Sequence, residues 1–202
     1  MRIVDIFAVV EGSLYAVRYN GKVYDEFKTL FDQWQDIEYL EQFFEDNKHD
    51  LKNGIYNHLS IEDAITRTIN EAFKFEKKIL HAAKNSINNS NAKNTLEKVV
   101  FTSLHKEIRS NEYIESKAYG TKRKSWLRVY AIRLAQDVYF VSGGAIKLTK
   151  DMRPPHLKEE LKKLKATTAY LKEEFIINEE DLGYIELGNY GEEYKRNNSK
   201  TK

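Results

Sequence analysis

The 202-residue sequence contains no cysteine, so the chain can form neither disulfide bonds nor thiolate metal sites. No early stretch combines a basic start with an apolar run, so we expect no signal peptide. The uninterrupted apolar runs are short, whereas a helix that spans a bilayer needs roughly 20 apolar residues. These absences predict a soluble, cytoplasmic protein with no segment that crosses a membrane.

The sequence also lacks the motifs of the common nucleotide- and metal-dependent enzymes. It has no Gly-Lys-Ser/Thr phosphate loop, no spaced glycine fingerprint for a dinucleotide and no nucleophile elbow. Its five histidines show no pair at the spacing of metal ligands. The histidines are His49, His58, His81, His105 and His156. We therefore expect no metal ion and no cofactor.

The charged residues are unevenly distributed, although the formal net charge is only +2. Residues 1–63 carry 6 basic and 13 acidic side chains, whereas the remainder carries 27 basic and 18 acidic ones. A basic second half suggests a polyanionic partner. A charged face that contacts only solvent is the alternative interpretation.

The composition predicts one compact domain overall, because 41% of the residues are hydrophobic and can form a sizeable core. Within it we distinguish an N-terminal region, 1–95, from a basic region, 96–188. The last residues, 189–202, are polar and highly charged, and we expect them to be a disordered tail.

The N-terminal region is predicted to contain strands followed by two long helices. Alternation and turn residues over 2–24 are typical of a hairpin or a three-strand meander. Apolar residues then recur at helical spacing over about 25–48 and about 61–85, with a loop at 48–59. We expect the first helix to bury four aromatic side chains, those of Phe27, Phe31, Trp34 and Phe44.

The basic region is predicted to be an antiparallel meander followed by a helix. Its three expected strands are 126–134, 138–141 and 145–149, with a turn at Gly143-Gly144. Pro154-Pro155 is typical of a helix start, and the apolar spacing after it extends to about residue 174. The predicted fold class is therefore α+β, an antiparallel sheet packed against long helices.

A cluster of basic residues opens the meander, with no acidic residue between Glu115 and Asp137. Its members are Lys117, Lys122, Arg123, Lys124, Arg128 and Arg133. Three aromatic residues, Tyr119, Trp126 and Tyr130, alternate with these charges. This combination lets a surface neutralise phosphates and stack on unpaired bases. A solvated turn at 122–124 is the alternative.

Alternation along the strand predicts which side chains share a face. Leu127, Val129 and Ala131 point one way, and Trp126, Arg128, Tyr130 and Ile132 point the other. If the aliphatic set faces the helices, Arg128, Tyr130 and Lys147 share the opposite face and converge with Lys150. Such a pocket can position an RNA phosphodiester and stabilise its transition state without a metal ion. Tyr130 would stack on a base or exchange a proton, unless it only packs.

The order of these features resembles the C-terminal core of RelE/HigB-type toxins, members of the RelE/ParE superfamily from bacterial type II toxin–antitoxin systems. The resemblance covers roughly 112–175: a basic lead-in, the strand 126–133, the hairpin to 138–150 and the charged helix from His156. It implies a small antiparallel sheet against helices and cleavage of mRNA, usually on the ribosome. It also implies an antitoxin partner, often a helix-turn-helix repressor.

The resemblance and the residue pattern together give the expected function, a metal-independent endoribonuclease toxin. The catalytic candidates are Arg128, Tyr130, Lys147 and Lys150. The candidates for RNA binding are Lys117, Lys122, Arg123, Lys124, Arg133 and His156. The alternative is a non-catalytic protein of a mobile genetic element that docks on nucleic acid or on another protein.

Overall fold

The computed structural model describes most of the chain. The described residues are 1–88, 92–105, 113–122, 124–174, 176 and 181. The tail expected at 189–202 and the basic residue Arg123 lie outside them. Every helix in the described part is too short or too polar to cross a bilayer.

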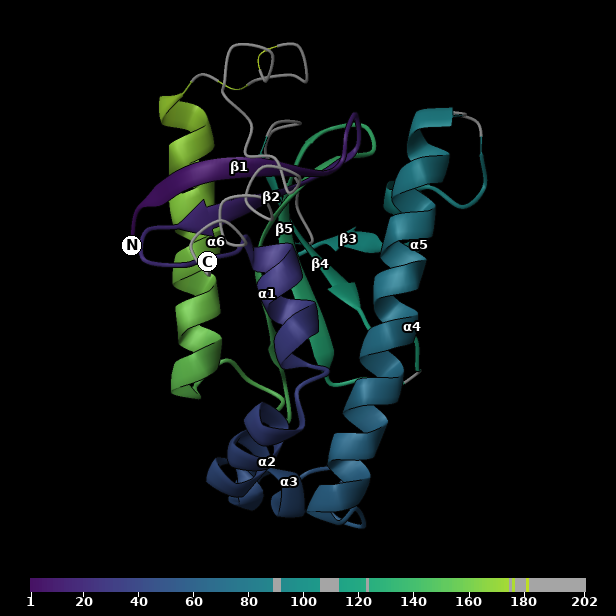
Figure 1. Ribbon diagram of the computed structural model, residues 1–202, viewed down its shortest axis with the longest axis vertical. Helices are drawn as coiled ribbons and strands as arrows, with labels where there is room; N and C mark the ends of the chain where they lie inside the picture. The colour runs from purple at the N-terminus through teal and green to yellow at the C-terminus, as the bar shows by residue number, and fades with distance from the viewer. Residues whose placement is uncertain (89–91, 106–112, 123, 175, 177–180, 182–202) are drawn as a thin grey trace, which may run out of the picture.

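Within the described residues, six strands form one sheet in the order β1-β2-β6-β5-β4-β3 (Figure 1). The strands are β1 (Ile3–Val10), β2 (Leu14–Tyr19), β3 (Phe101–Ser103), β4 (Ile114–Tyr119), β5 (Leu127–Ala135) and β6 (Val138–Ile146). Neighbouring strands are antiparallel except β2 and β6, which are parallel. The α+β class is confirmed, but the sheet is mixed, because the N-terminal hairpin joins the meander alongside β6.

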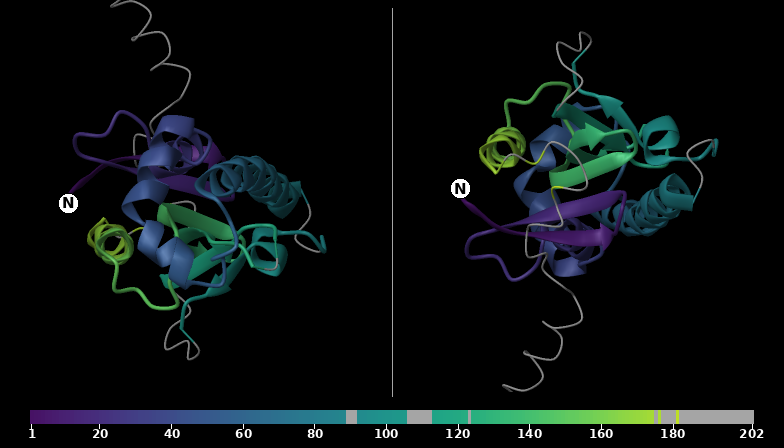
Figure 2. Two further views of the ribbon diagram at one scale, coloured as in Figure 1. Left: turned by 90° about the horizontal axis from the view of Figure 1, so that it is seen from below. Right: turned by 90° about the horizontal axis from the view of Figure 1, so that it is seen from above.

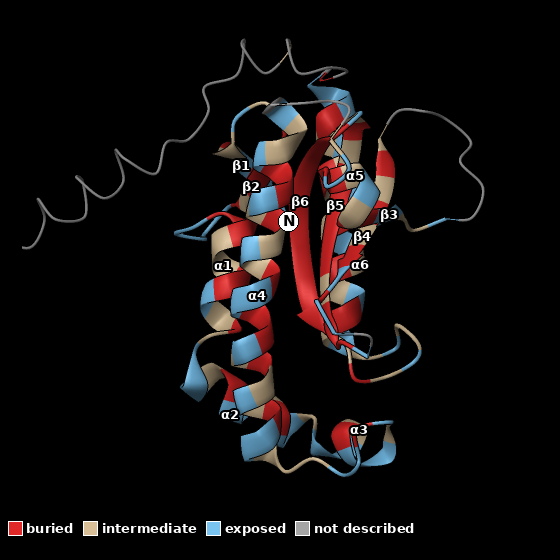
Figure 3. Cartoon of the chain, turned by 90° about the vertical axis from the view of Figure 1, so that its right-hand side faces the viewer, coloured by how far each residue is buried: buried red, intermediate tan, exposed pale blue. Residues whose placement is uncertain are grey.

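Six helices accompany the sheet in the described part of the chain. They are α1 (Glu26–Gln33), α2 (Ile37–Asp46), α3 (Lys48–Asn53), α4 (Ile61–Asn88), α5 (Leu96–Val99) and α6 (Pro155–Glu173). The two longest, α4 and α6, lie on opposite faces of the sheet (Figures 1 and 2). The buried strands therefore lie between two layers of helices, as the colouring in Figure 3 shows.

The helix predicted over 25–48 is divided in two by separate N-caps. The Asp25 carboxylate accepts hydrogen bonds from the backbone of Phe27 and Lys28, and the Asp36 carboxylate accepts one from Tyr39. Such caps satisfy the free N–H groups at a helix start, so α2 begins anew at Ile37. The expected burial of Phe27, Phe31, Trp34 and Phe44 is confirmed, since each is 3% exposed or less.

The second long helix is confirmed as α4, and the final helix as α6. The loop predicted at 48–59 begins instead with α3. The hydrophobic cluster on the α1–α4 face includes Leu127, Val129 and Ala131 of β5, as their alternation predicted. Tyr130 and Ile132 face the other way and pack in the cluster under α6. Trp126, predicted to share their face, packs instead in the cluster of Leu127, because it precedes β5 and the strand alternation does not apply to it.

Gly143 and Gly144 do not form the predicted turn, because they lie within β6, which continues to Ile146. A Cβ at Gly143 would lie 2.0 Å from a carboxylate oxygen of Glu160. One at Gly144 would lie 2.5 Å from the carbonyl oxygen of Arg128 and 2.8 Å from Leu30. The glycines therefore allow helices on both faces to approach the strand, and the separate strand expected at 145–149 does not form.

Candidate nucleic-acid binding site

A pocket opens beside α6 on the part of the sheet formed by β4 and β5. In this region Lys117 pairs across the strands with Tyr130, and Tyr119 pairs with Arg128. Alternation places all four on the face that α6 partly covers. The helix packs on β5, β6 and β1, and the pocket lies next to it.

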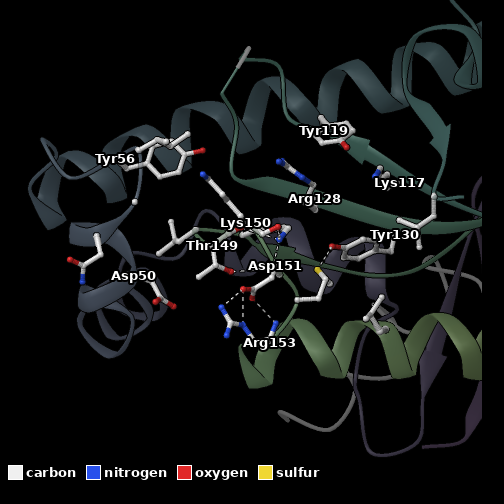
Figure 4. A pocket seen from close by; sticks show the side chains of 18 residues that line it. Asp50, Tyr56, Lys117, Tyr119, Arg128, Tyr130, Thr149, Lys150, Asp151 and Arg153 are labelled. Atoms are coloured by element: carbon white, nitrogen blue, oxygen red, sulfur yellow. Dashed lines mark hydrogen bonds and ion pairs between the residues drawn. The ribbon is translucent and has the colours of Figure 1, made fainter. Parts of the chain in front are cut away.

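The pocket has a volume of about 870 Å³, and most of its lining comes from three parts of the chain, with Leu104 and Leu161 completing it (Figure 4). The three parts are β4 and β5, the segment after β6, and the end of α3 with the residues that follow it. Its basic side chains are Lys117, Arg128, Lys147, Lys150 and Arg153, and its acidic ones are Asp50 and Asp151. The excess of cations favours an anionic ligand.

Arg128 is fixed in this pocket by neutral groups. Its guanidinium carbon lies 4.2 Å from the centroid of the Tyr119 ring, and Nη1 donates to the carbonyls of Ser125 at 2.8 Å and Leu127 at 2.7 Å. Burial lowers its pKa, but an arginine remains protonated in proteins. No acidic side chain among the described residues forms an ion pair with it. Within the described part of the chain, Arg128 is thus a half-buried cation without an ion-pair partner.

Lys147 holds the loop after β6 in place. Its ammonium group donates to the carbonyl oxygens of Thr149 and Lys150, each at 3.0 Å, and to that of Asp151. Burial lowers its pKa, and the nearby charge of Arg128 lowers it further. All three donated bonds organise the turn that carries the side chain of Lys150. Lys147 therefore acts on the pocket by positioning the loop, whereas the exposed ammonium group of Lys150 forms no ion pair with another described residue.

Tyr130 is buried, contrary to the expectation of an open face. Its ring is 2% exposed because α6 covers this part of the sheet, and its hydroxyl lies 3.8 Å from the sulfur of Met152. Burial raises the pKa of its hydroxyl to about 12. At neutral pH the hydroxyl stays protonated, so it can donate a hydrogen bond to a ligand but cannot act as a base.

Of the expected RNA-binding residues that the structure describes, Lys117 alone lines the pocket, and Arg133 and His156 have partners elsewhere. Arg133 forms an ion pair with Glu97 at 3.0 Å, near the other end of β5. His156 packs edge-on against Phe43, and its Nε2 lies 3.2 Å from the carbonyl oxygen of Ile146. Burial lowers the pKa of His156, so the ring is neutral at pH 7.

The basic loop between β4 and β5 is attached to the N-terminal region, 1–95. The carbonyl oxygen of Lys124 accepts hydrogen bonds from the Tyr56 hydroxyl at 3.1 Å and from Arg67 at 2.9 Å. Lys122 and Lys124 are exposed, and neither lines the pocket. A ligand would have to extend beyond the pocket to contact them.

The pocket wall formed by α3 was missed by the sequence reasoning. Asp50, Asn53 and Tyr56 line the pocket although they belong to the segment predicted to be a loop. A Cβ at Gly54 would lie 3.0 Å from the carbonyl oxygen of Asp50 and 3.4 Å from that of Leu148. Gly54 thus allows the end of α3 to approach the segment after β6. In the sequence, the only indication of this contact was a single glycine, Gly54, in a polar stretch. A glycine does not show which segment packs against it.

No protein-family model, curated protein or solved structure matches the chain. Among the described residues, no group of three His, Cys, Asp or Glu side chains is arranged to hold a metal ion.

Proposed function

We propose that the chain binds RNA in this pocket and cleaves it without a metal ion, as the toxin of a toxin–antitoxin pair. The observation that carries the proposal is the convergence of three cations, Lys117, Arg128 and Lys150, none in an ion pair within the described part of the chain. A phosphodiester supplies the missing negative charge. The tyrosine rings beside these cations suit a nucleic acid better than a small inorganic anion.

In the proposed reaction, the 2′-oxygen of one nucleotide attacks the adjacent phosphorus, and the bond from phosphorus to the 5′-oxygen breaks. The products are a 2′,3′-cyclic phosphate and a 5′-hydroxyl. Arg128 and Lys150 stabilise the extra negative charge on the phosphorane. Such electrostatic stabilisation by preorganised groups is usually the largest single contribution to the rate enhancement. The 5′-oxygen takes its proton from water.

The 2′-hydroxyl needs a proton acceptor within reach. Of the two carboxylates that line the pocket, Asp151 is held by Arg153 at 2.7 Å. Asp50 lies 3.7 Å from His49 and belongs to the wall opposite Arg128 (Figure 4). We therefore infer that the Asp50 carboxylate accepts the proton of the 2′-hydroxyl.

The resemblance to RelE/HigB-type toxins supports the same proposal. Arg128 matches the strand arginine of these toxins, and Lys150 matches a basic position of their final strand. On this basis the substrate is mRNA on the ribosome, and the partner is an antitoxin, often a helix-turn-helix protein. The resembling region, roughly 112–175, includes β4, β5, β6 and α6.

A second candidate function is RNA binding without cleavage. It is favoured by the position of His156, whose imidazole could accept a proton but lies outside the pocket, and by the raised pKa of Tyr130, which keeps its hydroxyl protonated. The two functions share the same cationic pocket and differ only in the chemistry of the bound phosphodiester.

Incubation of the purified chain with an end-labelled single-stranded RNA in the presence of EDTA tests the proposal. We expect fragments that end in a cyclic phosphate, and growth arrest when the chain is expressed in a bacterium without its partner. Asp50→Asn should bind the RNA but not cleave it. Lys74→Ala, which changes an exposed lysine of α4 away from this pocket, is the matched control. Binding with no cleavage by the unchanged chain would establish the second function, and no binding would exclude both.

A further inference from the structure

The three aromatic residues that alternate with the basic cluster have different environments in the structure. Trp126 is fully buried, and its ring packs 5.6 Å from Phe44 and 4.8 Å from Tyr56. Tyr130 is 2% exposed. Tyr119 alone of the three is open to solvent, with 42% of its surface exposed, and it lines the cationic pocket.

The Tyr119 ring is held in place by the sheet. Tyr119 lies opposite Arg128 in the β4–β5 ladder, and the guanidinium carbon of Arg128 lies over the ring, 4.2 Å from its centroid. The Lys117 ammonium lies 5.6 Å from the ring centroid, two residues away on the same face of β4. A ring fixed by a neighbouring guanidinium loses little further freedom when a ligand packs on it.

We propose that Tyr119 is the stacking platform for one unpaired nucleobase, whose adjoining phosphate is bound by Arg128. This inference rests on the proposed function and specifies its substrate class as single-stranded RNA. In a duplex both faces of each internal base are already stacked on neighbouring bases, so a duplex can offer the ring no base except at its ends. Stacking tolerates any base, because every base has a π-face.

The contribution of Tyr119 is therefore aromatic and does not depend on its hydroxyl. Tyr119→Phe should retain the affinity of the unchanged chain for a short single-stranded RNA. Tyr119→Leu keeps an apolar side chain on the strand but removes the π-face, and it should weaken binding about tenfold or more. A duplex of the same length should compete poorly with the single strand.

Tyr24 provides a matched control for these variants. It is 39% exposed and lies under a cation, Lys28, at 4.7 Å, but it does not line the pocket. Tyr24→Leu removes an equally exposed, cation-packed ring from another place on the surface. It should leave RNA binding unchanged.

Tyr119→Trp provides a direct optical measurement of stacking. Trp34 and Trp126 are 1% and 0% exposed, so an indole introduced at position 119 is the solvent-exposed one. Its fluorescence should be quenched on titration with a single-stranded oligonucleotide. The variant should bind this oligonucleotide as tightly as the unchanged chain does. Because this variant keeps an aromatic ring, it provides a test even where Tyr119→Leu fails to fold.

The outcomes separate this inference from the proposed function. Loss of binding in Arg128→Ala with unchanged binding in Tyr119→Leu overturns the stacking platform and leaves the proposed function standing. Absence of quenching in Tyr119→Trp while RNA is bound also overturns the platform, as does equal competition by duplex. If the unchanged chain binds no RNA, both proposals fail together.

Discussion

The ammonium nitrogen of Lys163 lies 2.8 Å from a carboxylate oxygen of Glu26 and 2.8 Å from one of Glu160. Glu26 belongs to α1 and Lys163 to α6, so this contact joins the helices of the two layers. All three groups are largely buried, with Glu26 1% exposed. One ammonium faces two carboxylates, and burial raises the pKa of Glu160 to about 7 and raises that of Glu26 as well.

Glu160 should make the stability of the protein depend on pH. Its pKa is higher in the folded state, about 7, than the ordinary value of 4.5, so folding favours the protonated form. The corresponding stability is present below about pH 4.5 and is lost as the pH rises through about 7. We expect the free energy of unfolding to fall over this range by an amount on the order of 1 to 3 kcal/mol.

Glu160→Gln isolates this effect. The amide removes the negative charge of residue 160, so Glu26 is the one carboxylate left in contact with Lys163. The carboxylate of Glu26 is then stabilised in its charged form. Urea denaturation at pH 5 and pH 7.5 should show a smaller difference for Glu160→Gln than for the unchanged chain. An equal fall in both proteins would assign the pH dependence to other groups.

Trp34 should be among the main contributors to core stability. Its ring is 1% exposed and packs edge-on against Phe31 at 5.3 Å. Trp34→Ala removes the buried ring and leaves a cavity, which should cost roughly 3 to 5 kcal/mol in the free energy of unfolding. The buried Trp126 remains as the fluorescent probe for the measurement. A cost below about 1 kcal/mol would contradict the packing seen around α1.

The local patterns of the sequence predicted the parts of the fold that neighbouring residues determine. Alternation separated Leu127 and Val129 from Arg128 and Tyr130, because successive side chains on a strand point to opposite faces. Helical spacing predicted α4 and α6 for the same kind of reason. The break before α2 was not predicted, since the apolar spacing continues across Asp36.

These local patterns could not predict the contacts between residues that are far apart in the sequence. Nothing local to Tyr130 indicates that α6 buries it, or that Glu97 pairs with Arg133. The contribution of Asp50 to a pocket in the basic half depends on where α3 packs, which is a tertiary property. Five of the expected residues nevertheless line one pocket, namely Lys117, Arg128, Tyr130, Lys147 and Lys150.

RNA binding should weaken steeply with salt. Each phosphate that a lysine or arginine neutralises releases condensed counterions, with a slope of about −0.7 per contact for single strands. Contacts by Lys117, Arg128 and Lys150 therefore predict a slope near −2 in a plot of log affinity against log salt concentration. Lys150→Ala should reduce the magnitude of that slope by about 0.7, and Lys74→Ala should leave it unchanged. Salt-independent binding would rule out phosphate contacts as the basis of the interaction.

Arg128 is the residue whose replacement should affect activity most. Arg128→Ala removes the cation that faces the scissile phosphate and should abolish RNA cleavage and growth arrest. It also removes the donors to the carbonyls of Ser125 and Leu127, so we expect a loss of about 1 to 2 kcal/mol in stability with the fold retained.

Arg128→Lys distinguishes the charge of this residue from its shape. A lysine restores the positive charge, but its ammonium group cannot present two parallel donors to a phosphate or cover the Tyr119 ring as a planar guanidinium does. We therefore expect RNA binding to recover more fully than cleavage, measured on the same end-labelled RNA with circular dichroism as the control for folding. Full activity in a folded Arg128→Ala protein would show that the reacting phosphate does not depend on Arg128, the nearer of the two cations over the Tyr119 ring at 4.2 Å, against 5.6 Å for Lys117.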